Sequence, residues 1–145
     1  MKLIRLGPKG QERPGLWQAD GIVDLRVLFP DIPDIDESFF RQGWPQRLAG
    51  LQAPGRKLEV RWGAPLARPS KIICLGKNYV EHAKEGGFEA PASPLIFCKT
   101  PNTLNGPFDP VLLPQSSGQI DWEVELAVVI GAEGKRIAKA HALAH

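Results

Sequence analysis

The sequence predicts an α+β protein in which short strands outnumber helices. Gly contributes 15 and Pro 14 of the 145 residues, an excess that indicates many turns between short elements. Apolar side chains recur at every second position over residues 122–130, which is typical of a strand, whereas helical patterns are short, as at 79–85. A hydrophobic fraction of 43% and a charged fraction of 23% fit a globular protein with a core.

Composition argues against several classes of partner. The formal net charge is only +2, and Lys and Arg are dispersed, so we expect neither nucleic acid nor a membrane surface as a partner. Residues 126–130, the longest aliphatic run, are far too few to cross a bilayer, and residues 1–7 lack the apolar core of a secretory signal. Cys74 and Cys98 lie within apolar runs and are predicted to be buried, reduced thiols. These features favour the cytoplasm.

Residues 1–68 are predicted to form a small accessory domain. An antiparallel unit begins it: residues 2–6 alternate as a strand, 15–17 start a second strand, and a turn at 19–21 leads into a third at 22–25. Two short helices follow, one starting at Asp36 and ending at Gly43, the other from Pro45 to about Leu51. Residues 57–62 have strand character, and nothing in this domain has a catalytic pattern.

Residues 69–145 have a different texture. We predict four strands and two helices there, with Asn78 as the cap of the first helix, Glu81 completing a capping box, and Gly86-Gly87 as its end. The second helix has no capping residue after it, so we expect the domain to be truncated and to continue beyond His145. The predicted strands are 72–75, 95–99, 111–113 and 122–130, and the helices are 79–85 and 139–145.

Two carboxylates share one face of the predicted strand 122–130. Glu123 and Glu125 are two residues apart, and such side chains point to the same side of a strand. In a cleft they would repel each other unless a cation lay between them, and carboxylate oxygens suit hard divalent cations. The pattern therefore permits either a metal site or an edge strand with a solvated acidic face.

Further candidates lie earlier in this domain. Tyr79, His82 and Glu85 recur at every third position of the predicted helix and share a face. A carboxylate three residues after a histidine can orient the imidazole and stabilise its protonated form, as in general-base catalysis, although a solvated His–Glu pair has the same spacing. Lys99, at a strand end, is either solvated or pairs with a substrate carboxylate or enolate.

Three segments resemble the catalytic domain of the fumarylacetoacetate hydrolase family, in the family's order. They are residues 71–85, residues 94–101 with Gly106-Pro107 after them, and residues 121–131. Residues 1–68, with Gly15-Leu16 and Asp20-Gly21, are similar to the accessory domain of many smaller members. The resemblance implies a mixed β-roll, of which residues 69–145 would be the first part, and a further metal-binding Asp beyond His145.

The same resemblance implies roles for the candidates. Glu123 and Glu125 would bind Mg²⁺ or Mn²⁺, His82 and Glu85 would activate water, and Lys99 and Tyr79 would bind substrate. The implied reaction is hydrolysis of a carbon–carbon bond in a 2-oxo acid or 1,3-diketone, such as an acylpyruvate, by a homodimer. The helix from Tyr79 and residues 86–93 would form a lid.

Other interpretations remain open. The same scaffold could serve an isomerase, a decarboxylase or a ureidoglycolate-type lyase. The 145 residues alone are expected to be inactive, and a fragment that acts only as a folding or association module is a further alternative. Trp122 is predicted to be a core residue, with the dimer interface as the other possibility.

Overall fold

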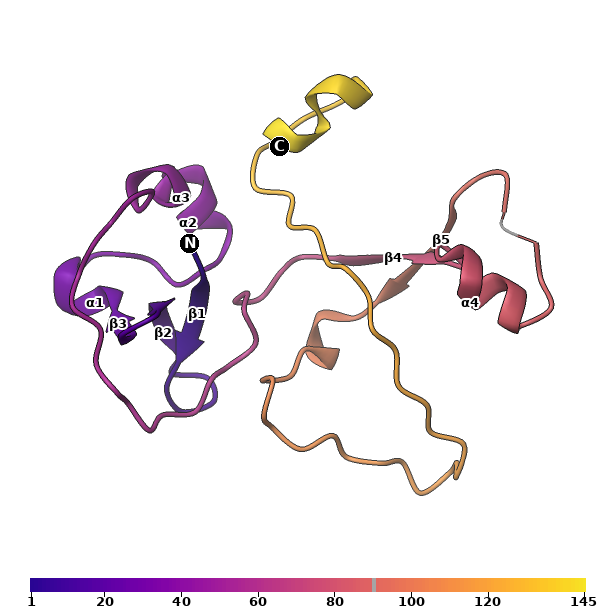
Figure 1. The fold of residues 1–145 in the computed structure, drawn as a ribbon, viewed down its shortest axis with the longest axis horizontal. Coiled ribbons are helices and arrows are strands. Elements are labelled where there is room, and N and C mark those ends of the chain that lie inside the picture. Colours follow the sequence, from indigo (N-terminus) through magenta and orange to yellow (C-terminus); the bar gives the residue numbers. More distant parts are fainter. Residues whose placement is uncertain (90) are drawn as a thin grey trace. The chain divides into compact units, whose positions relative to one another are not determined.

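A computed structural model describes residues 1–89 and 91–145 (Figure 1). Within these residues the chain forms five β-strands, four α-helices and two short 3₁₀-helices, which confirms the predicted predominance of strands. The chain divides into two compact units. The first combines Met1–Ala67 with Asn105–His145, and the second is Arg68–Leu104.

A three-stranded antiparallel sheet organises the first unit. Strands β1 (Leu3–Leu6), β2 (Arg13–Gln18) and β3 (Gly21–Asp24) follow one another in space as in sequence, as the alternation and turn residues predicted. Gln18 pairs with Gly21, so the β2–β3 connection has two residues. Gly15 on β2 has no alternative, because a Cβ there would lie 2.3 Å from a methyl carbon of Leu6.

Three short helices cover one face of this sheet. They are α1 (Leu25–Leu28), α2 (Glu37–Arg41) and α3 (Trp44–Arg47). The predicted helix start at Asp36 is confirmed, since its carboxylate accepts hydrogen bonds from the Ser38 and Phe39 backbone N–H groups at 2.9 and 3.3 Å, which satisfies two otherwise unpaired donors. The sequence did not predict α1. The buried core between sheet and helices consists of Leu16, Val23, Leu25, Ile32, Ile35, Phe39, Trp44 and Leu48.

The opposite face is covered by the segment before Gly63. Ile4, Leu6 and Ile22 form a second buried cluster, against which Val60 and Trp62 pack. The predicted strand 57–62 is wrong as a continuous element, because the described structure assigns only isolated bridges there, Leu6 with Trp62 and Ile22 with Arg56. The segment contributes side chains to the core without a continuous hydrogen-bonded ladder.

Five charged side chains form a connected network in the first unit. Arg5 donates two hydrogen bonds to the Asp34 carboxylate, at 2.8 and 2.7 Å, and one to Glu12 at 3.3 Å. Arg61 donates to Glu12 at 2.8 Å and forms a two-point contact with Asp109, at 2.8 and 2.6 Å. The Glu12 side chain is only 7% exposed. Such two-point contacts fix geometry as well as charge.

We expect this network to make folding sensitive to acid. Burial raises the pKa of Glu12, but hydrogen bonds from Arg61 and from backbone N–H groups outweigh it, so this pKa lies below its ordinary value. The hydrogen bond from Arg61 is the main cause that lowers the pKa of Asp109. Carboxylates of this kind stabilise the fold above their unfolded-state pKa of about 4, and the stabilisation is lost as pH falls through the lower folded-state value. The free energy of unfolding, from urea titrations, should therefore decline below about pH 4. The decline should be shallower in Glu12→Gln, and an identical decline would contradict the assignment.

The second unit is a two-stranded hairpin with one helix. Strands β4 (Ile72–Gly76) and β5 (Leu95–Lys99) pair antiparallel, with Ile72 opposite Lys99 and Gly76 opposite Leu95. Helix α4 (Val80–Glu85) follows β4, and the 3₁₀-helix η1 (Pro101–Thr103) follows β5. Both predicted strands and the helix are confirmed. Cys74 is buried as predicted, but Cys98 is exposed, because a two-stranded sheet is too narrow to cover both of its faces.

The last part of the first unit contains little regular structure. Its only assigned helix is η2 (Lys139–Ala144), of 3₁₀ type rather than α-helical, and the described structure assigns no strand over 111–113 or 122–130. Trp122 is 82% exposed, so the prediction of a core residue is wrong here. Alternation predicts which side chains would share a face, but a strand also needs a hydrogen-bonded neighbour, which the described residues do not provide.

Candidate functional site

Helix α4 carries the predicted base and its orienting carboxylate. His82 and Glu85 lie within α4, three positions apart and therefore on one side of it. The helix begins one residue later than predicted: Tyr79 is its N-cap, and the described structure shows no capping hydrogen bond from a side chain, so the capping box predicted from Asn78 and Glu81 is wrong. Its end agrees with the prediction, since Gly86 follows α4 and Gly87 has a φ of 72°.

His82 and Glu85 are both exposed. In the part of the chain that the structure describes, no hydrogen bond joins them, whereas Glu81 on the same helix pairs with Lys84 at 3.3 Å. Ala83, in contrast, is 2% exposed, so α4 has one covered side and presents His82 and Glu85 elsewhere. The structure thus confirms the helix and its spacing, and the chemical role of the pair stays a prediction.

Lys77 and Phe88 bracket this helix, and the sequence gave no signal for their contact. Lys77 has a φ of 53°, the left-handed conformation that non-glycine residues rarely adopt. Its Nζ lies 3.2 Å from the centre of the Phe88 ring, and the Phe88 N–H donates to the Ala83 carbonyl at 2.8 Å. A contact between ammonium and ring thus links the residues on either side of α4.

The predicted substrate-binding residues lie at different places in the second unit. Tyr79 is the N-cap of α4 and is 42% exposed. Lys99 is exposed and pairs with Ile72, at the end of the hairpin farthest from the turn that leads to α4. Four strand residues separate these two ends, roughly 13 Å along the sheet. The hairpin by itself therefore does not bring Lys99 to the start of α4.

Glu123 and Glu125 belong to the first unit, in the exposed segment before Gly131. Within the described residues neither side chain makes a hydrogen bond or an ion pair, so all four oxygens are available to a cation. Hard carboxylate oxygens are the donors that Mg²⁺ and Mn²⁺ prefer, so the pair fits such an ion chemically. Residues 1–89 and 91–145 contain no group of three or more His, Cys, Asp or Glu side chains arranged to hold a metal, so the pair would be part of a ligand set.

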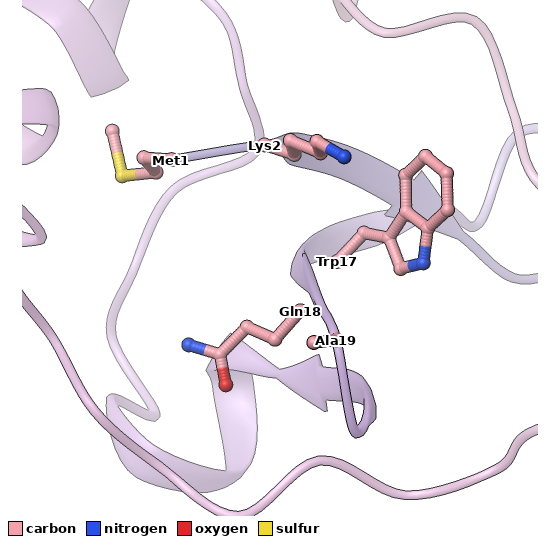
Figure 2. Close-up of a pocket in the computed structure, with 5 residues that line it drawn as sticks. All are labelled: Met1, Lys2, Trp17, Gln18 and Ala19. Atoms are coloured by element: carbon pink, nitrogen blue, oxygen red, sulfur yellow. The ribbon is translucent and has the colours of Figure 1, made fainter.

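The most prominent surface hollow lies elsewhere. It has a volume of about 430 Å³ and is lined by Met1, Lys2, Trp17, Gln18 and Ala19. Figure 2 shows these side chains around an open space, with the Lys2 ammonium beside the Trp17 indole, 4.4 Å from the ring centre. Its lining offers no carboxylate, imidazole or thiol, so it does not have the composition of a catalytic site.

Comparison with known proteins places this arrangement of elements. The family model described as "Fumarylacetoacetate (FAA) hydrolase C-terminal" matches residues 71–145. A solved structure titled a "putative HpcE protein" from Mycobacterium smegmatis aligns with a TM-score of 0.61 and 32% identity, over 79% of this chain and 41% of that one. The second half of the chain thus falls within a class of enzyme domain, and the family follows directly: the chain belongs to the fumarylacetoacetate hydrolase family.

Named relatives extend the comparison over the first half. "Oxaloacetate tautomerase FAHD2A, mitochondrial" of Homo sapiens is 40% identical over 131 residues, which are 86% of this chain and 42% of the relative. A "Putative hydrolase" of Burkholderia multivorans is 41% identical over 146 aligned positions, covering 99% of this chain and 51% of the relative. The chain therefore spans about half the length of the curated relatives that it matches.

The helices were also compared with the requirements of a membrane span. Among residues 1–89 and 91–145, none combines the length and the hydropathy that crossing a bilayer demands.

Proposed function

We propose that these residues belong to a divalent-metal-dependent enzyme that hydrolyses a carbon–carbon bond in a 2-oxo acid or 1,3-diketone. The observation that carries this proposal is the match of residues 71–145 to the family model, a region that contains every candidate side chain, namely Tyr79, His82, Glu85, Lys99, Glu123 and Glu125. Their types suit the reaction: an imidazole with a carboxylate, a cation and two further carboxylates.

Each side chain has a definite task in this proposal. Glu123 and Glu125 would hold Mg²⁺ or Mn²⁺, which when bound polarises the substrate carbonyl as a Lewis acid. Neutral His82 takes a proton from water, while Glu85 orients the ring and stabilises the imidazolium. The hydroxide adds to the carbonyl carbon, the adjacent carbon–carbon bond breaks, and the released carbon leaves as an enolate that is then protonated. Lys99 would pair with the carboxylate or the enolate oxygen, and Tyr79 would contact the substrate.

Tautomerisation is the second candidate. It is favoured by the relative named as an oxaloacetate tautomerase, which is 40% identical to this chain. The chemistry is simpler: one carbon loses a proton and an oxygen gains one, with no bond between carbons broken and no water consumed. His82 could carry the proton in that reaction too, so the candidate residues serve both proposals and only the fate of the substrate separates them.

A substrate comparison tests the two functions. The complete gene product with Mg²⁺ should convert an acylpyruvate into pyruvate and a carboxylic acid, detected by product analysis. Faster decay of enol-oxaloacetate to the keto form, with acylpyruvates left intact, would instead establish the tautomerase. Loss of neither substrate, with no binding of Mg²⁺ or Mn²⁺ in calorimetry, would support the third alternative, a module for folding or association.

Compartment and assembly remain predictions of the same kind. We expect a cytoplasmic homodimer, although the human relative's name assigns that protein to mitochondria. The apolar side chains exposed in the segment with the two carboxylates, including Trp122 and Val124, could lie at an interface. We expect no nucleic acid and no membrane as a partner.

A further inference from the structure

The segment that carries Glu123 and Glu125 is held at both ends by residues of the N-terminal 67. One anchor lies at 106–109, where three contacts coincide. Arg61 forms its two-point contact with Asp109, the Phe108 ring packs edge-on against Trp62 with centroids 5.8 Å apart, and Gly106 is buried.

Close approach explains why a glycine stands at this anchor. A Cβ on Gly106 would lie 2.4 Å from the Trp62 carbonyl oxygen and 2.7 Å from an Asp109 oxygen, closer than side-chain carbons occur. The Gly106 N–H also donates to Asp109 at 3.2 Å. The Asp109 carboxylate therefore binds both its own loop and Arg61, which joins the loop to the network around Glu12.

The second anchor lies at Gly131. A Cβ there would be 3.1 Å from a ring carbon of Phe40, which follows the core residue Phe39 on α2. The Gly131 N–H donates to the His145 carbonyl at 2.7 Å, and the Ala132 N–H donates to the same oxygen at 2.9 Å. The intervening residues 110–130 are exposed throughout, so their contacts with the rest of the unit concentrate at the two ends.

We propose that Arg61 is a positioning residue for the carboxylate pair: by binding Asp109 it fixes the start of the segment whose far end packs at Phe40. The N-terminal residues thereby gain a task that their sequence does not display, which is to limit the conformations of residues 110–130. This inference rests on the proposed function, because it takes Glu123 and Glu125 to be metal ligands. Arg61 itself touches neither the metal nor the substrate.

The consequence for metal affinity follows from populations. An ion that needs both carboxylates in one arrangement binds only the fraction of molecules in which the segment adopts it, so the apparent dissociation constant rises as that fraction falls. Asp109→Asn should free the segment from Arg61 while leaving Arg61 its contact with Glu12. We expect Mn²⁺ to bind about three- to tenfold more weakly, for a three- to tenfold loss of the competent fraction.

The test uses the complete gene product and Mn²⁺ alone, with affinity measured by electron paramagnetic resonance of the free ion. The variants are Asp109→Asn and Arg61→Lys, which keeps the charge but loses the two-point geometry. Arg41→Met is the matched control, because it removes an exposed ion pair with Glu37 away from both anchors. Hydrogen exchange of residues 110–130 without metal, and thermal unfolding, are followed in parallel.

The outcomes are distinct. The inference holds if both anchor variants exchange faster and bind Mn²⁺ more weakly at a temperature where they are fully folded, if saturating Mn²⁺ restores their turnover number, and if the control matches the wild type. It is overturned if the anchor variants bind Mn²⁺ as the wild type does while Glu123→Gln abolishes binding, which leaves the proposed function standing. If Glu123→Gln also binds normally, the metal assignment fails and the inference with it.

Discussion

Replacing Glu123 by Gln should abolish metal binding and turnover together in the complete gene product. Gln keeps the size of the side chain but removes the negative charge, and hard divalent ions bind a neutral amide oxygen far less well than a carboxylate. Because a bound metal stabilises the transition state by several kcal/mol as a Lewis acid, turnover should fall at least about a hundredfold. Calorimetry with Mg²⁺ and Mn²⁺, combined with initial rates across metal concentrations, measures both effects.

Glu133→Gln is the matched control for this experiment. Glu133 is exposed and lies ten residues further along the same segment, so the variant removes the same charge without touching the predicted pair. The control should bind metal and turn over as the wild type does. Unchanged turnover in Glu123→Gln would falsify the metal assignment and leave the solvated acidic face as the explanation of the pair.

Replacing His82 by Ala should lower kcat about 10²- to 10⁴-fold, the usual contribution of a positioned general base. The loss should leave Mn²⁺ affinity unchanged, because His82 lies in the second unit and is not among the predicted ligands. Glu85→Gln should cause a smaller loss, since it leaves the imidazole in place and removes only the charge that stabilises its protonated form. Steady-state kinetics at saturating metal, with pH profiles of kcat, measure these changes.

Lys84→Met controls for damage to α4. Lys84 lies on the same helix, is exposed and pairs only with the exposed Glu81 in the described structure, so its loss should cost little. If His82→Ala and Lys84→Met have equal kcat values on every 2-oxo acid and diketone tested, His82 is a solvated surface residue. If both variants lose activity equally, the helix and not the imidazole is responsible.

The local elements were predictable where local chemistry decides them. Asp36 caps α2 because its carboxylate reaches N–H groups two and three residues away, and the short turn before Gly21 follows from residues that tolerate its geometry. Strands β4 and β5 were predictable from short apolar runs bounded by Gly, Pro and polar residues. In each case the interaction partners lie within a few residues or across one hairpin.

The predictions failed where distant partners decide. The alternation at 122–130 predicts a strand, but the described residues offer it no neighbouring strand, and its apolar side chains, including Trp122, are exposed. Cys98 lies in an apolar run like that of Cys74, yet only Cys74 is covered. The contact between Lys77 and Phe88 depends on a left-handed backbone at Lys77, for which a lysine gives no signal.

The sequence by itself determined the family, the order of the candidate residues and most short elements, because these depend on residue type and spacing along the chain. Only the tertiary structure decided that Arg5, Glu12, Asp34, Arg61 and Asp109 form one network and that residues 110–130 are anchored at Arg61 and Phe40. Arg61 and Asp109 are 48 residues apart, and the partner of a charge at such separation is chosen by how the intervening chain packs rather than by any local pattern.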